Sequence, residues 1–162
     1  MKRTWLTVDF DDLRHVPSAQ GHPTRSKKPV EDRGLSKAYS LGLKRFEAWL
    51  EGNEHPVTLF IIADLLHDEA FTRWLERMLA AFGNRLTVGC HGLTHRSWSA
   101  WPEDIEGFSS ALQQATAMLE QACGASFRFW FRAPAGYIAP WMAGVLASQG
   151  YSVDSSVNPS WL

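Results

Sequence analysis

The sequence is poor in cysteine, has no long apolar run and carries almost no net charge. Cys90 and Cys123 are its only cysteines, too few for a disulfide scaffold, so a reducing compartment is expected. The basic start at Met1 reaches Asp9 before an apolar segment of signal-peptide length can form, and no run is long enough to span a bilayer. The formal net charge of -1 gives no general attraction to nucleic acid. We therefore expect a cytoplasmic protein with no membrane span and no nucleic-acid partner.

Strand and helix signals alternate along a chain whose 162 residues and 45% apolar content fit one domain, residues 1–162. Short β-rich or apolar runs predict five strands, at residues 5–9, 57–62, 86–90, 127–131 and 152–157. Helical spacing predicts helices between them, over residues 35–50 and 140–149, around residues 71–82, and from near Pro102 to just before Gly124. The helix between Pro102 and Gly124 has the most regular apolar spacing, from Ile105 and Phe108 to Leu119 and Ala122. Buried strands separated by helices predict an α/β fold with a parallel sheet or barrel.

Polar residues follow three of the predicted strands. They are Asp9, Asp11 and Asp12 after the first, His91 and His95 after the third, and residues 132–137 after the fourth. Ligand sites in parallel α/β folds lie at the carboxyl ends of the strands, so we expect these residues on one rim. Two imidazoles four residues apart can reach one ion, and a carboxylate would supply a third ligand. The pattern predicts a divalent metal site, with zinc as the first choice and cobalt or nickel as alternatives.

Three segments resemble the motifs of one known family, the polysaccharide deacetylases of the NodB homology group, carbohydrate esterase family 4. The segments are Thr7-Val8-Asp9-Phe10-Asp11-Asp12, His91-Gly92-Leu93-Thr94-His95 and Arg132-Ala133-Pro134-Ala135-Gly136-Tyr137, and Val57–Ile61 also resembles the family's second strand. The resemblance implies a deformed parallel (β/α) barrel of NodB type. It also implies metal-dependent hydrolysis of N-acetyl groups on a carbohydrate.

The resemblance further implies roles for single residues. Asp9 would act as the general base, which Arg132 would orient. The metal would be held by Asp11, His91 and His95, and it would lower the pKa of its bound water toward ~7. The backbone amide of Ala135 would help to stabilise the oxyanion.

The carboxylate ligand has two candidates, because the family's first motif has two adjacent aspartates and this chain offers three. Side chains alternate along a strand, so Asp9 and Asp11 share a face while Asp12 points away, which favours Asp11. If the strand already ends at Phe10, Asp12 could rotate inward and replace Asp11.

Aromatic and basic residues near the rim leave further alternatives open. Trp98, Trp101 and Tyr137 are placed to meet a sugar substrate, although Trp98 and Trp101 suit core packing equally well. The connection over residues 13–34 is long and rich in lysine and arginine. It could bind an anionic part of the substrate, or it could be a solvated loop. The remaining histidines are expected to have no catalytic role: His15, His22, His55 and His67.

The predicted domain lacks its last strands and late motifs. A closed (β/α) barrel typically needs ~250 residues, and only five strand signals are present here. The family's later Leu-x-His segment, whose histidine is the implied general acid, has no counterpart, and no histidine follows His95. We therefore expect a fragment of a longer protein, a chain completed by another chain, or a cycle without the usual acid. An incomplete barrel edge also favours homo-oligomer formation.

The expected function is the removal of N-acetyl groups from a polysaccharide or from a sugar of glycan biosynthesis. A fold does not fix a substrate, so the same site could act on another carbon–nitrogen bond, in an allantoinase-like reaction. The missing general acid motivates a different alternative, a non-catalytic or truncated metal-binding NodB-like module.

Overall fold

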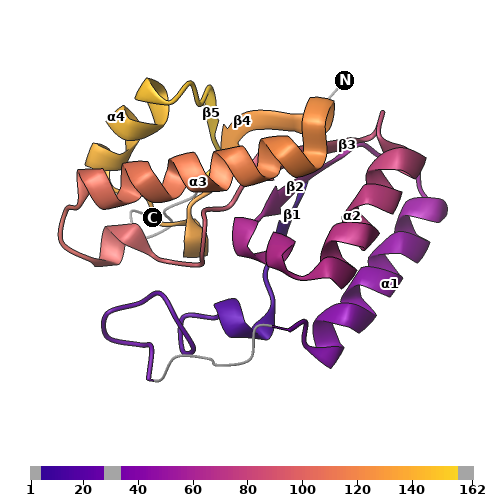
Figure 1. Cartoon of the computed structure of the whole chain (residues 1–162), viewed down its shortest axis with the longest axis horizontal. Helices are drawn as coiled ribbons and strands as arrows, with labels where there is room; N and C mark the ends of the chain where they lie inside the picture. The colour runs from indigo at the N-terminus through magenta and orange to yellow at the C-terminus, as the bar shows by residue number, and fades with distance from the viewer. Residues whose placement is uncertain (1–4, 28–33, 157–162) are drawn as a thin grey trace.

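Five parallel strands form one sheet, in a computed structural model that describes residues 5–27 and 34–156. The strands follow one another in sequential order, β1 (Leu6–Phe10), β2 (Val57–Ile61), β3 (Leu86–Cys90), β4 (Phe127–Phe131) and β5 (Val153–Asp154). The helices α1 (Lys37–Glu51), α2 (Glu69–Phe82), α3 (Ile105–Cys123) and α4 (Pro140–Ser148) each connect two neighbouring strands. Crossovers of one hand between sequential strands place all four helices on the same side of the sheet (Figure 1). This parallel sheet with alternating helices has the incomplete (β/α) barrel architecture predicted from the sequence.

Most predicted elements differ from the structure by one or two residues at an end, and two differ by more. The helix predicted from near Pro102 begins only at Ile105, because the Asp104 side chain accepts the Gly107 N–H at 2.8 Å and caps the first turn. Ile105 is 49% exposed, so the buried stripe of this helix starts at Phe108. The strand predicted over residues 152–157 has two residues within the described part, and residue 157 lies outside it.

The core lies between the sheet and the helices. All five residues of β2 are buried, as expected for a central parallel strand covered on both faces. At the end of β1, Phe10 packs against Phe46 of α1 and Trp74 of α2, with ring centroids 5.7 and 5.6 Å apart. At the end of β4, Phe131 packs against Phe108 of α3 at 6.0 Å. These contacts fix the strand ends, and thereby the residues that follow them.

The opposite face of the sheet carries a row of aromatic side chains. Phe60 of β2 contacts Trp5, with ring centroids 6.2 Å apart, and Trp5 contacts Trp130 of β4 at 5.6 Å. Phe60 is paired in register with Gly89 of β3, where an added Cβ would come within 2.6 Å of the Phe60 ring. The missing side chain at Gly89 therefore lets Phe60 lie flat across the sheet.

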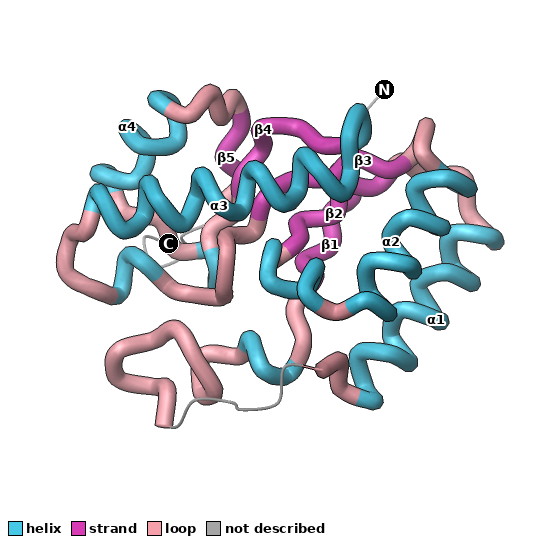
Figure 2. The backbone as a smooth tube through the Cα atoms, viewed as in Figure 1, coloured by secondary structure: helices cyan, strands magenta, loops and turns pink. Residues whose placement is uncertain are grey.

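The long connection after β1 runs beside the loop that follows β3 (Figure 2). The Gly21 carbonyl accepts hydrogen bonds from the Ser97 N–H at 2.9 Å and from the Trp101 indole at 3.2 Å. The described part of this connection is thus docked onto the rim of the sheet. Within the described part of the chain, no helix combines the length and apolar character that crossing a membrane requires.

Candidate metal centre

The first four strands end level with one another. The register pairs Phe10 with Ile61, Ile61 with Cys90, and Cys90 with Phe131. The residues that come directly after β1, β3 and β4 are Asp11, His91 and Arg132. They therefore emerge side by side at the carboxyl edge of the sheet, where ligand sites of parallel sheets are found.

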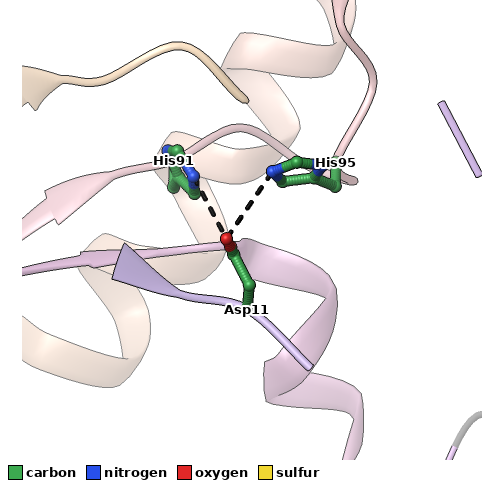
Figure 3. Close-up of side chains that lie close together, drawn as sticks. All are labelled: Asp11, His91 and His95. Atoms are coloured by element: carbon green, nitrogen blue, oxygen red, sulfur yellow. Dashed lines mark ion pairs between the residues drawn. The ribbon is translucent and has the colours of Figure 1, made fainter. Parts of the chain in front are cut away.

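Asp11, His91 and His95 form a group that could hold a metal ion. One ligand atom from each side chain lies within 4.8 Å of the other two. The Asp11 carboxylate oxygens lie 3.5 Å from His91 Nε2 and 3.6 Å from His95 Nε2, and both imidazoles point toward this carboxylate (Figure 3). Ligand atoms of a tetrahedral zinc ion lie about 3.4 Å apart when each bond is about 2.1 Å long. The two distances from Asp11 therefore fit such an ion.

The hydrogen bonds of His91 leave its Nε2 atom for a ligand. His91 Nδ1 lies 2.8 Å from the Arg132 carbonyl oxygen, and because a carbonyl only accepts, Nδ1 carries the proton. Nε2 then faces the Asp11 carboxylate. Among the described residues this buried nitrogen has no hydrogen-bond partner. A cation between the nitrogen and the carboxylate would satisfy both groups, and a backbone carbonyl behind a ligand histidine is a common means of orienting it.

Burial changes the protonation of the other two candidate ligands. It lowers the pKa of His95 to about 3, an effect strengthened electrostatically by the neighbouring imidazoles of His91 and His15. His95 is therefore neutral at pH 7, the form that binds metals. Burial also raises the pKa of Asp11, although the charge of His91 opposes this shift. A bound cation would favour the ionised Asp11 carboxylate.

Asp12 points away from the histidines. Strand β1 ends at Phe10. An end at this residue is what would allow Asp12 to turn inward and replace Asp11 as the metal ligand. The Asp12 carboxylate instead accepts the Leu13 N–H at 2.6 Å and the Ser36 N–H at 2.8 Å. It caps the short 3-10 helix Leu13–His15 and ties the start of α1 to the rim.

Asp9 pairs with Arg132 across the sheet. The Arg132 guanidinium donates to Asp9 Oδ1 at 2.7 Å and to the Ser155 hydroxyl at 3.1 Å. Its charged carbon lies 4.4 Å from the centre of the Phe60 ring. Three contacts thus fix the direction of the guanidinium. The sequence pattern does not single out Phe60 or Ser155 as site residues, because Phe60 lies in a continuous apolar run and Ser155 is a lone serine after a short strand.

A family model described as polysaccharide deacetylase matches residues 37–153. The chain belongs to the polysaccharide deacetylase family. It shares 21% identity, at a TM-score of 0.68, with a Mycobacterium smegmatis protein described as a polysaccharide deacetylase, covering 94% of this chain and 50% of that one. It shares 22% identity with IcaB from Ammonifex degensii, at a TM-score of 0.56 and covering 76% and 56% of the two chains.

A CE4 family pseudoenzyme from Bacillus anthracis is also similar, at 18% identity and a TM-score of 0.60, covering 75% of this chain and 40% of that one. The chain thus spans about half the length of these solved structures. At such identities the likeness concerns the fold. No curated protein sequence matches closely enough to count as a relative.

The third motif of this deacetylase-family chain turns sharply after Pro134. Ala135 has a φ of 59°, the only positive φ of a non-glycine residue in the described ranges. A left-handed backbone at alanine costs about 1–2 kcal/mol, and such strain is most often retained at functional sites. Tyr137, two residues later, is 38% exposed and lines a surface pocket together with Ala135.

The two tryptophans after the second motif are engaged within the protein. Trp98 packs edge to face against Phe108 at 5.6 Å, and the Arg96 guanidinium lies 4.3 Å from its ring centre. The same guanidinium lies 4.5 Å from the ring of Trp101. Trp98 therefore packs against the hydrophobic core and is partly exposed.

One histidine that was set aside in the sequence lies close to the site. His15 is fully buried, its Nδ1 accepts the Asp12 N–H at 2.9 Å, and its Nε2 lies 2.8 Å from Asp64 Oδ1. Its ring centre lies 6.5 Å from that of His95. The sequence offers one sign that His15 lies near the site. It follows Asp12 by three residues, at the end of a turn that Asp12 caps.

Proposed function

We propose that this chain is a metal-dependent N-deacetylase that acts on a carbohydrate. The observation that carries the proposal is the meeting, on one rim, of the Asp11, His91 and His95 group with the Asp9–Arg132 ion pair. Membership of the polysaccharide deacetylase family supports the choice of an acetylated carbohydrate as substrate. We further propose that the chain forms a single NodB-like domain.

The proposed ligands are Asp11 Oδ and the Nε2 atoms of His91 and His95. A divalent ion held there, zinc in the first place and cobalt or nickel as alternatives, would supply Lewis-acid polarisation of the acetyl carbonyl and a water of lowered pKa. The protein's own contribution is to orient both imidazoles and to keep His95 neutral. The Arg132 carbonyl fixes the His91 tautomer, and burial keeps His95 uncharged.

Asp9 is the proposed general base. The Arg132 guanidinium occupies Asp9 Oδ1 and holds the carboxylate in one direction, which leaves Oδ2 for the proton of an attacking water. Asp9 is 36% exposed by its side chain, so water has access to it. The backbone amide of Ala135 is the proposed oxyanion donor, since the strained turn fixes the direction of that peptide. Tyr137 and Trp98 are proposed to contact the sugar.

Acetate release tests this function. The metal-free chain would be loaded with zinc, cobalt or nickel and incubated with N-acetylglucosamine oligomers, and separately with a cyclic amide such as allantoin. We expect acetate from the oligomers only in the presence of metal. Ring opening of the cyclic amide without acetate release would instead assign the site to another carbon–nitrogen bond.

A non-catalytic metal-binding module is the second candidate. It is favoured by the likeness to a CE4 family pseudoenzyme. This candidate predicts one tightly bound metal per chain and no turnover of either substrate class.

A further inference from the structure

A pocket of about 370 Å³ lies on the same rim as the candidate metal centre. This volume is within the range of about 300–1,000 Å³ that is typical of small-molecule sites. Three segments line the pocket. The connection after β1 contributes His22 and Arg25, the loop after His95 contributes Ser97, and the third motif and the residues after it contribute Ala135, Tyr137 and Ile138.

The wall formed by the β1 connection is fixed against the loop that carries His95. Gly21 has a φ of 82°, and a Cβ at this position would overlap the His95 carbonyl oxygen. This close approach, together with the Ser97 and Trp101 hydrogen bonds to the Gly21 carbonyl, joins the wall to the ligand loop. The backbone segments that carry the pocket wall and the ligand His95 are therefore in direct contact.

Hydrogen bonds within the wall also fix the His22 imidazole and the backbone of Arg25. The His22 N–H donates to the Ser26 hydroxyl at 3.0 Å, and that hydroxyl donates to the Pro17 carbonyl at 3.0 Å. His22 Nδ1 accepts the backbone N–H groups of Thr24 and Arg25, each at 3.2 Å. Because Nδ1 accepts, the imidazole proton lies on Nε2. His22 is therefore a hydrogen-bond donor through its other nitrogen.

The polar side chains that line the pocket can donate further hydrogen bonds. The Ser97 side chain is 2% exposed, and its buried hydroxyl has no hydrogen-bond partner among the described residues. Arg25 forms no ion pair with any carboxylate in the described part of the chain, and no acidic residue lines the pocket. A buried hydroxyl without a partner is costly, and a guanidinium favours a planar oxyanion.

We propose that this pocket binds an anionic oxygen group, a carboxylate or a phosphate, carried by the carbohydrate beside the sugar that is deacetylated. Arg25 forms charge-assisted hydrogen bonds with the anion, and the Ser97 hydroxyl and His22 Nε2 donate to its oxygens. Tyr137 and Ile138 contact the apolar faces of the sugar ring. The inference rests on the proposed function, because it identifies the substrate class of the same site.

Substrate pairs of equal length test the subsite. The metal-loaded chain would be given neutral N-acetylglucosamine oligomers, and the same oligomers with either a carboxylate ether or a phosphate monoester on the neighbouring sugar. We expect a higher kcat/KM for one of the anionic forms, and the preferred form identifies the anion. Arg25→Gln should lower that kcat/KM by about 10-fold, the typical contribution of a charged hydrogen bond, with less than a 2-fold change for the neutral oligomer.

Lys27→Gln is the matched control. Lys27 lies in the same connection, is exposed and does not line the pocket, so removing its charge should leave both substrates within 2-fold of the unsubstituted chain. An equal loss in Lys27→Gln and Arg25→Gln would overturn the subsite in favour of a general charge effect. No discrimination between neutral and anionic oligomers would also overturn it, while leaving the deacetylase proposal intact.

Binding without turnover separates the two proposals. Deacetylated oligomers with and without the anionic group would be titrated into the metal-loaded chain by calorimetry. Weaker binding of the anionic product by Arg25→Gln and by Ser97→Ala supports the subsite, even if no acetate is released from any substrate. Unchanged affinity in both variants overturns it, even if the chain is an active deacetylase.

Discussion

The backbone carbonyl of Arg132 accepts the Nδ1 proton of His91 at 2.8 Å. The side chain of the same arginine pairs with Asp9 at 2.7 Å. One residue therefore orients a proposed metal ligand through its main chain and the proposed base through its side chain. The two roles can be separated by substitution, because only the side chain changes.

Arg132→Gln should retain the metal and lose turnover. The carbonyl that fixes His91 remains, so zinc per chain should stay at the level of the unsubstituted protein. Loss of the guanidinium frees Asp9 to rotate, and kcat should fall on the order of 10²-fold, at the lower end of what a misplaced general base costs. Zinc content by mass spectrometry and initial rates of acetate release would be measured on the same samples. Loss of zinc in this variant would contradict the separation of roles.

Asp11→Asn and Asp12→Asn should have opposite effects. Asp11 faces both histidines, so its amide should reduce zinc retention after dialysis by more than 10-fold, as expected for a lost ligand. Asp12 accepts two backbone N–H groups, so its amide should keep the zinc but lower the free energy of unfolding by about 1 kcal/mol. Retained zinc in Asp11→Asn would show that the carboxylate ligand lies elsewhere.

The sequence predicted the strands and helices from buried apolar runs and helical periodicity, which are local patterns, and it predicted the rim from the usual position of sites in parallel sheets. It favoured Asp11 over Asp12 as the ligand only through side-chain alternation along a strand. The sequence could not show that the Ser36 N–H, which the start of α1 brings to the rim, donates to the Asp12 carboxylate. It likewise could not show that the connection after β1 docks onto the loop of His95, since that contact depends on a single backbone approach at Gly21. Long-range backbone contacts of this kind leave no periodic signal.

The metal-free protein should become less stable as the pH falls from 7 to 5. The pKa of His95 is about 3 in the folded chain and near 6.5 when unfolded, so within this window the unfolded state binds the extra proton. Stability is then lost at up to about 1 kcal/mol per pH unit. The raised pKa of Asp11 acts in the opposite sense, so the comparison needs a reference variant. Urea unfolding of the chelator-treated protein and of His95→Gln should give a smaller pH slope for the variant. Equal slopes would contradict the burial of a neutral imidazole.

Gly89→Ala should destabilise the sheet and disturb the Asp9–Arg132 pair. The new Cβ would lie 2.6 Å from the Phe60 ring and 3.0 Å from the Trp130 carbonyl oxygen, and Phe60 supports the Arg132 guanidinium. We expect a loss of about 1–3 kcal/mol in the free energy of unfolding, together with a lower kcat. Gly144→Ala is the matched control, since an added Cβ there meets nothing within 4 Å. It should stabilise α4 by up to about 1 kcal/mol. An unaltered stability in Gly89→Ala would show that Phe60 moves aside freely.

The dependence of acetate release on zinc occupancy tests the proposed centre most directly. The metal-free chain would be titrated with zinc, and the initial rate on the preferred N-acetylated oligomer would be plotted against zinc bound per chain. We expect the rate to rise linearly and to level off at one zinc per chain, with Asp9→Asn binding the same zinc at a rate lower by about 10²–10⁴-fold. Full occupancy by zinc with no more acetate than Asp9→Asn releases would contradict a catalytic role for this site.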